Sequence, residues 1–82
     1  MALVSEIELT RKERQTVHRP TRCLCSILHS PEGEPFIQLD TYGSPDRQFT
    51  EKVSQSIQLD ARAAAQLKKI IEDTFPELSV GT

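Results

Sequence analysis

The segment Val53–Leu59, followed at once by Asp60, constrains the fold more than any other part of the chain. Its side chains alternate: one side carries Val53, Gln55, Ile57 and Leu59, and the other carries Ser54, Ser56 and Gln58. A period of two residues predicts a strand with one largely apolar face and one wholly polar face. Because a helix is expected directly after this strand, it covers one face of the sheet, and the polar face stays open to water or to a partner.

A helix over residues 61–75 is predicted from its start, its apolar stripe and its end. Asp60 suits the N-cap because its carboxylate accepts hydrogen bonds from the exposed amides of a first helical turn. Apolar residues then recur at spacings of three and four, the pattern of an amphipathic helix. They are Ala64, Leu67, Ile70, Ile71 and Phe75. Pro76 cannot continue the helix, and residues 77–82 are expected to form a flexible tail.

Two earlier strands are expected to form a hairpin. The run CLCSIL favours a strand over residues 22–29, and the run FIQLDTY favours one over residues 36–42. Between them, Pro31 suits the first central position of a turn, and Gly33 accepts a positive φ. A polar loop over residues 43–51 then leads to the strand that precedes the helix.

These elements predict an α+β fold: a small curved antiparallel sheet of three to four strands, followed by one C-terminal amphipathic helix packed on one face. Residues 11–76 are expected to form a single domain. Residues 1–10 are expected to be weakly ordered or to form an edge strand, since Ile7 and Leu9 alternate with polar residues. A chain of 82 residues with four aromatic side chains has a thin core, so a homodimer is expected.

Charge is unevenly distributed, although the net charge is only −2. Residues 11–22 hold five basic side chains against Glu13 alone, whereas the rest of the chain holds five basic and eleven acidic ones. The five are Arg11, Lys12, Arg14, Arg19 and Arg22. A local cluster of this kind attracts phosphate even on an acidic protein. Two interpretations stay open: a solvated segment that leads into the first hairpin strand, or an arm that contacts phosphate or a partner.

Aromatic and polar side chains are expected to meet on the open face of the sheet. Phe36, Gln38, Asp40 and Tyr42 share one parity on their strand. If they join the serine and glutamine row, two rings lie among short hydrogen-bonding groups, a surface on which single-stranded nucleic acid stacks. The residues predicted to contact nucleic acid are Arg11, Lys12, Arg14, Arg19, Phe36, Gln38, Tyr42, Arg47, Lys52 and Ser54. The alternatives are a plain solvated face and a protein-interaction module that adds a partner strand at the exposed sheet edge.

Cys23 and Cys25 form a C-x-C pair, which differs from the C-x-x-C of redox and zinc motifs. His29 shares their parity and His18 lies nearby in the sequence, so a metal site with four ligands is one hypothesis. The favoured interpretation is that both cysteines are small hydrophobic side chains on a buried strand face.

No catalytic constellation is visible in the sequence. It contains neither a G-x-S-x-G elbow nor a glycine-rich phosphate loop, and its aspartates lack the spacing of a metal or acid–base site. We therefore expect no enzymatic activity, no cofactor and no small-molecule substrate. No apolar run approaches the ~18 residues of a membrane span, and no signal peptide begins the chain. A cytoplasmic protein without membrane contact is expected.

Residues 11–75 resemble a group of short bacterial proteins of unassigned function. The shared stretches are HRPT at His18–Thr21, IQLDTYGS from residue 37 and K-x-SQSIQ from residue 52. Members of the group are sometimes labelled methionyl-tRNA formyltransferase. This chain is too short for a formyl-folate site and shows no matching Asn, His and Asp catalytic set, so the resemblance implies no such activity.

A more distant resemblance is to the transcriptional coactivator family called positive cofactor four. There, a strand F-I-x-I-R precedes a loop, a K-x-G-I-S-L strand and a helix with an L-x-x-L-L-type stripe. FIQLD, KVSQSIQLD and AAQLKKII follow in the same order here, over about half of the chain. The resemblance implies a β-β-β-β-α homodimer whose sheets bind single-stranded or melted DNA. It places Phe36, Gln38, Arg47, Lys52 and Ser54 at or near the groove; Asp40 stands where a basic residue is usual, and the glycine of K-x-G is missing.

Overall fold

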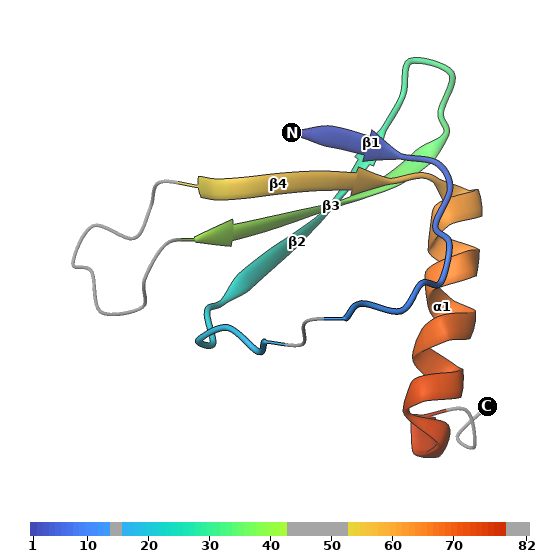
Figure 1. The fold of residues 1–82 in the computed structure, drawn as a ribbon. Helices are drawn as coiled ribbons and strands as arrows, with labels where there is room; N and C mark the ends of the chain where they lie inside the picture. Colours follow the sequence, from blue (N-terminus) through green and yellow to red (C-terminus); the bar gives the residue numbers. More distant parts are fainter. Residues whose placement is uncertain (14–15, 43–52, 79–82) are drawn as a thin grey trace.

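A four-stranded open sheet followed by one C-terminal helix makes up the protein, which confirms the predicted α+β fold class (Figure 1). The computed structural model describes residues 1–13, 16–42 and 53–78. Its elements are β1 Ala2–Val4, β2 Cys23–His29, β3 Pro35–Tyr42, β4 Val53–Leu59, helix α1 Ala61–Thr74 and a 3-10 turn η1 Pro76–Leu78. From β2 to α1, each boundary lies within one residue of its predicted position. The predicted loop at residues 43–51 lies outside the described residues.

The strands follow the order β1-β4-β3-β2. β3 pairs antiparallel with both β2 and β4, whereas β1 pairs parallel with β4. The sheet is therefore mixed, and the prediction of a purely antiparallel sheet is wrong for its first strand. The pairing is parallel because β1 and β4 both run toward the start of α1, where the N–H of Asp60 donates to the carbonyl of Val4 over 3.3 Å (Figure 1).

The first strand lies at Ala2–Val4, and the prediction that Ile7 and Leu9 belong to an edge strand is wrong. Both residues lie beside α1, where they line a hollow with Gln66 and Ile70. The N–H of Ile7 donates to Oε1 of Gln66 over 2.7 Å. The helix extends beyond the sheet (Figure 1). The N-terminal segment therefore packs beside the helix and not along the edge of the sheet.

The hairpin between β2 and β3 turns through the predicted proline and glycine. The N–H of Gly33 donates to the carbonyl of Ser30 over 2.8 Å, and Gly33 has a φ of +88°. Pro31 occupies the first central position, where its fixed φ favours the turn. The N–H of Glu34 donates to the Ser30 hydroxyl over 3.1 Å. This turn fixes the register of the hairpin, from His29 opposite Pro35 to Cys23 opposite Thr41.

Helix α1 begins at the predicted cap and ends one residue before its predicted end. The carboxylate of Asp60 accepts from the N–H of Ala63 over 2.9 Å. At the other end, the N–H of Phe75 donates to the carbonyl of Ile71 over 2.8 Å. The first two residues of the predicted tail, 77 and 78, belong to η1, in which the N–H of Leu78 donates to the carbonyl of Phe75. Proline opens this turn easily, since the first residue of a helical turn needs no donor. Residues 79–82 lie outside the described residues.

We expect Asp60→Ala to lower the free energy of unfolding by about 1 kcal/mol, because the N–H of Ala63 then loses its acceptor. The loss is measured by urea denaturation followed by circular dichroism at the helix band. Asp60→Asn is the matched control, since asparagine caps a helix about as well as aspartate. Equal losses in both variants would assign the effect to the charge of Asp60 instead of its capping hydrogen bond.

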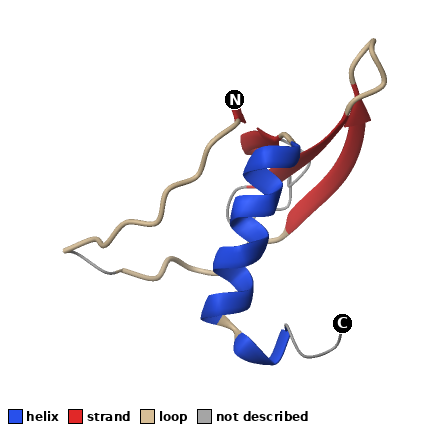
Figure 2. Cartoon of the chain, turned by 90° about the vertical axis from the view of Figure 1, so that its right-hand side faces the viewer, coloured by secondary structure: helices blue, strands red, loops and turns tan. Residues whose placement is uncertain are grey.

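Little apolar surface is buried within one chain. Among the described residues, the buried hydrophobic side chains are Leu59 and Ala63, which are 5% and 0% exposed. Figure 2 shows the reason: α1 meets the strands near its start, and the rest of the helix extends past them. On the helix side of the sheet, Ile57 and Ile27 therefore stay 41% and 70% exposed.

Cys23 and Cys25 are both exposed, so their predicted place on a buried strand face is wrong. The register puts them on the helix side of the sheet, opposite Thr41 and Leu39. They stay exposed because β2 is the outermost strand on its side of the sheet and lies two strands away from β4, which carries α1.

Candidate functional site

The sheet face that α1 leaves open is the candidate binding surface, called here the helix-free face. Its members come from all four strands and are Leu3, Leu24, Ser26, Leu28, Phe36, Gln38, Asp40, Tyr42, Val53, Ser56 and Gln58. Gln38 pairs with Gln58, and Asp40 pairs with Ser56. Paired residues point to the same side of a sheet, so the β3 set meets Ser56 and Gln58 here, as the alternation predicts. The prediction is wrong for Val53, which pairs with Tyr42 and joins this face instead of the apolar one.

Ser54 occupies an irregular position at the end of this face. Thr41 pairs with Gln55 and Tyr42 pairs with Val53, so Ser54 has no partner of its own in the pairing of β3 with β4. This is the register shift of a β-bulge, which bends a strand and turns side chains away from the regular alternation. Ser54 is exposed there, next to the undescribed residues 43–52.

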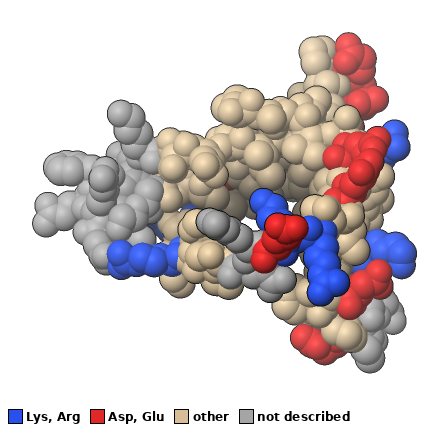
Figure 3. All heavy atoms as spheres, in the orientation of Figure 1, with Lys and Arg blue, Asp and Glu red and all other residues tan. Residues whose placement is uncertain are grey.

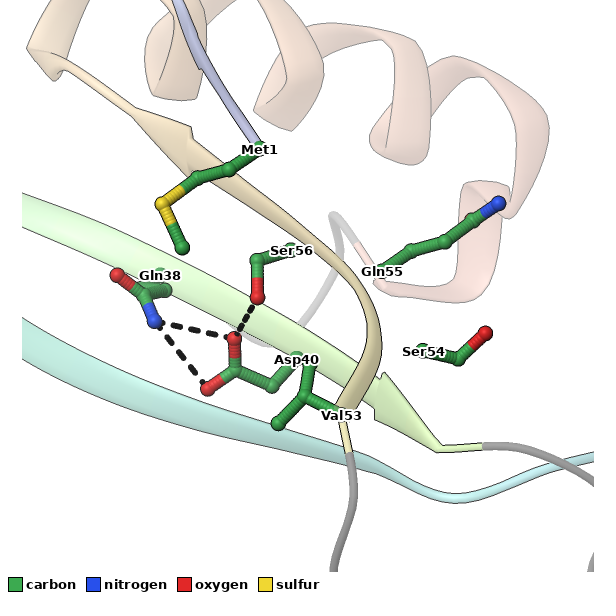
Figure 4. Close-up of a pocket in the computed structure, with 7 residues that line it drawn as sticks. All are labelled: Met1, Gln38, Asp40, Val53, Ser54, Gln55 and Ser56. Atoms are coloured by element: carbon green, nitrogen blue, oxygen red, sulfur yellow. Dashed lines mark hydrogen bonds between the residues drawn. The ribbon is translucent and has the colours of Figure 1, made fainter.

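A chain of hydrogen bonds joins the polar side chains of the helix-free face. The Ser56 hydroxyl donates to Oδ1 of Asp40, and the side-chain amide of Gln38 donates to Oδ1 and Oδ2 over 3.0 and 3.3 Å (Figure 4). The amide of Gln58 donates in turn to Oε1 of Gln38 over 2.8 Å. These groups are therefore occupied by one another, and Ser56 is only 8% exposed. The prediction of a free polar row at Ser54, Ser56 and Gln58 is wrong for its central member.

A shallow hollow of about 360 Å³ lies over this network. It is lined by Met1, Gln38, Asp40, Val53, Ser54, Gln55 and Ser56 (Figure 4). The Asp40 carboxylate lies among these side chains and already accepts hydrogen bonds from two of them. A carboxylate repels phosphate, so the centre of the helix-free face does not suit a nucleic-acid backbone.

Arg22 and Tyr42 form a second feature, at the end of the face where β3 finishes. The guanidinium carbon of Arg22 lies over the Tyr42 ring, 5.1 Å from its centroid, which is a cation–π arrangement. The hydroxyl of Thr21 donates to the carbonyl of Tyr42 over 3.0 Å and holds the two segments together. The prediction included Tyr42 and omitted Arg22 from the contact residues. The hairpin register would have found it, because a continuation of the pairing past Cys23 and Thr41 brings Arg22 opposite Tyr42.

The predicted basic residues are scattered. Arg11, Lys12 and Arg19 are exposed and lie in irregular segments before β2, and Arg14, Arg47 and Lys52 lie outside the described residues. In the view of Figure 3, basic and acidic side chains of the described residues are interspersed over the helix half of the molecule, and a separate basic group lies near the start of β2. Phe36 is half-buried, and Gln38 is engaged in the hydrogen-bond chain.

In comparisons with known proteins, no family model, no curated protein and no solved structure matches this chain. Function therefore has to be argued from the residues of the chain itself.

Metal-ligating side chains do not gather in the described parts of the chain, where no three His, Cys, Asp or Glu residues lie close enough to share an ion. Neither α1 nor η1, the helical elements that the structure describes, has the length and apolar character needed to cross a membrane.

Proposed function

We propose that this chain is a non-enzymatic module that binds single-stranded nucleic acid at the Tyr42 end of its helix-free face. The observation that carries the proposal is the Arg22 guanidinium over the Tyr42 ring, at the margin of an open sheet and next to a basic segment. Exposed aromatic rings and arginine planes both stack with bases, regardless of sequence. Unpaired bases are available for such stacking, which favours a single strand over a duplex.

Phosphate contacts complete the proposed mode of binding. Asp40 keeps the backbone of the nucleic acid away from the centre of the sheet, so the strand passes along the β2 side, past Arg22 and Arg19. Arg11, Lys12, Arg14, Arg47 and Lys52 are proposed as further phosphate contacts. We propose three additional contacts: Phe36 and Gln38, which lie farther along β3, and Ser54, which lies on β4.

A labelled single-stranded oligonucleotide tests this proposal by its salt dependence. If the four described cations Arg11, Lys12, Arg19 and Arg22 each neutralise one phosphate, binding weakens about 50-fold between 50 and 200 mM salt. A duplex of the same sequence is expected to bind more weakly. Fluorescence anisotropy measures both affinities. A flat salt response, or no binding at low salt, would remove the proposal.

Three variants locate the contact. Tyr42→Leu removes a stacking ring and keeps apolar bulk, so it is expected to weaken binding by roughly 5- to 150-fold, since one stacked base contributes about 1–3 kcal/mol. Arg22→Ala is compared with Arg62→Ala, which removes the same charge from α1, where Arg62 pairs with Glu6 over 3.3 Å. Only the Arg22 variant is expected to weaken binding. Equal effects would show that general charge, and not this site, attracts the oligonucleotide.

A protein-interaction module is the second candidate, and the outer edge of β2 favours it. β2 reads CLCSILH, without a proline or a Lys, Arg, Asp or Glu, and it is exposed along most of its length. Natural sheets protect such edges with charge, proline or a covering element, because an unprotected edge adds further strands. Binding of one defined protein that survives nuclease treatment and is lost in Leu24→Lys would favour this candidate over nucleic acid.

A further inference from the structure

One chain exposes far more surface than a folded protein of its size. Its accessible surface is 7429 Å² for a mass of 9.3 kDa, against about 5,000 Å² expected from the scaling of monomeric proteins. The radius of gyration is 15.0 Å, against about 12 Å expected for a compact domain of this length. About 2,400 Å² of surface per chain is thus in excess, and this excess amounts to a whole interface.

Part of the exposed apolar surface lies on the helix side of the sheet, where Ile27 and Ile57 are exposed. A groove of about 370 Å³ opens there between β2, β3 and the first turns of α1. Its lining includes Cys25, Ile27, Ile37, Leu59, Ala61 and Ala64, and Asp60 is the one charged residue in it. Ile27 on its outer wall is 70% exposed. No described element of the same chain fills this groove.

The exposed side of α1 continues directly from that groove. Ala64 lines the groove, and Ile71 and Phe75 follow it at spacings of seven and four, which keeps them on the same side of a helix. Ile71 is 37% exposed and Phe75 is 51% exposed. Leu78 in η1 lies beyond them and is 56% exposed. The outer part of α1 therefore has an exposed apolar side that no strand of the chain covers. The groove on the sheet is also apolar, and no described helix of the chain covers it.

We infer that a second copy of this chain docks on the helix side of the sheet, with the outer part of each α1 lying across the groove of its partner. Both complementary surfaces occur on every chain, so two copies related by a two-fold axis satisfy each other in one closed, isologous interface. If both chains buried this excess, the interface would cover about 4,800 Å² in total, within the range of obligate homodimer interfaces, which are also the more hydrophobic ones. A partner that offered only a helix or only a groove would leave one of the two surfaces uncovered.

This interface lies opposite the helix-free face. The inference therefore does not depend on nucleic-acid binding, and each proposal can fail alone. In the dimer, both helix-free faces stay accessible.

The mass in solution tests the inference. Light scattering after size exclusion is expected to give twice the chain mass of 9.3 kDa, and the melting temperature is expected to rise with protein concentration. A single-chain mass at high concentration, with a melting temperature that does not change with dilution, would overturn it.

Three lysine variants locate the interface. Ile27→Lys places a charge in the groove, and Phe75→Lys places one on the outer part of α1. Each variant is expected to give the single-chain mass or to lower the dimer affinity by at least tenfold. Leu24→Lys is the matched control: Leu24 lies on β2 like Ile27, is 47% exposed, and faces the opposite side of the sheet. It is expected to keep the dimer.

If Leu24→Lys dissociates the dimer while Ile27→Lys and Phe75→Lys preserve it, the helix side is not the interface. Should one of the two disruptive variants fail to fold, the other variant and the concentration dependence of the natural chain still decide.

Discussion

Replacing Leu59 with alanine is expected to lower the free energy of unfolding by about 2–5 kcal/mol, the largest effect of any single truncation proposed for this chain. Leu59 is 5% exposed and is the largest buried hydrophobic side chain among the described residues. It lies between Val4 and Ile37 on the neighbouring strands and lines the groove under the start of α1. Its removal leaves a cavity where sheet and helix meet.

The size of this loss matters because the whole domain is small. Stability of about 0.05–0.15 kcal/mol per residue gives about 4–12 kcal/mol for a chain of this length. Urea denaturation followed by circular dichroism measures the loss. Leu24→Ala is the matched control, since it makes the same truncation at a side chain that is 47% exposed, and we expect a loss below about 1 kcal/mol there. Similar losses at Leu24 and Leu59 would show that Leu59 is not central to the packing.

Asp40→Ala is expected to cost about 1–3 kcal/mol of stability, because it leaves two donors without an acceptor. The Ser56 hydroxyl and the Gln38 amide both donate to the Asp40 carboxylate. Ser56 is only 8% exposed, so water replaces the lost acceptor poorly. Asp40→Asn keeps one oxygen acceptor in nearly the same place, and a smaller loss is expected for it.

Thermal and urea unfolding of both Asp40 variants measure this effect. Asp73→Ala serves as the control for removing an aspartate charge: Asp73 pairs with Lys69 over 3.4 Å on the exposed side of α1, and such surface pairs contribute about 0.5 kcal/mol or less. If Asp40→Ala is no more costly than Asp73→Ala, the hydrogen-bond chain on the helix-free face does not stabilise the sheet.

Local patterns predicted most of the secondary structure. The alternation from Gln55 to Leu59, the Asp60 cap and the Ser30–Gly33 turn each depend on residues that are close in sequence, and the structure forms all three. In each case the physical cause lies within a few residues: side-chain parity, an unsatisfied amide, or a backbone that needs a positive φ. Such causes can be recognised without knowledge of the rest of the fold.

Contacts between distant segments were predicted less well. β1 has three residues, too few to show alternation, and its parallel pairing depends on β4 near the other end of the chain. The exposure of Cys23 and Cys25 depends on how far α1 reaches over the sheet, and strand parity does not contain that information. The candidate site contains one success and one failure of this kind. Strand parity predicted that Asp40 and Ser56 lie on the same face of the sheet. Their hydrogen bond could not be predicted, because it depends on the register between β3 and β4.

The position of β1 has a consequence for the order in which this sheet can assemble. Its partner β4 is the last strand to be synthesised, so β1 stays unpaired while the rest of the sheet is made. The β2–β3 hairpin closes through a short turn and can form early, whereas pairing β1 with β4 requires closure of about two thirds of the chain, from Ala2 to Ile57. Until β4 arrives, the apolar segment Ala2–Val4 and the uncharged edge of β2 are both available to other chains, which makes the period before β4 pairs the one most exposed to misassembly.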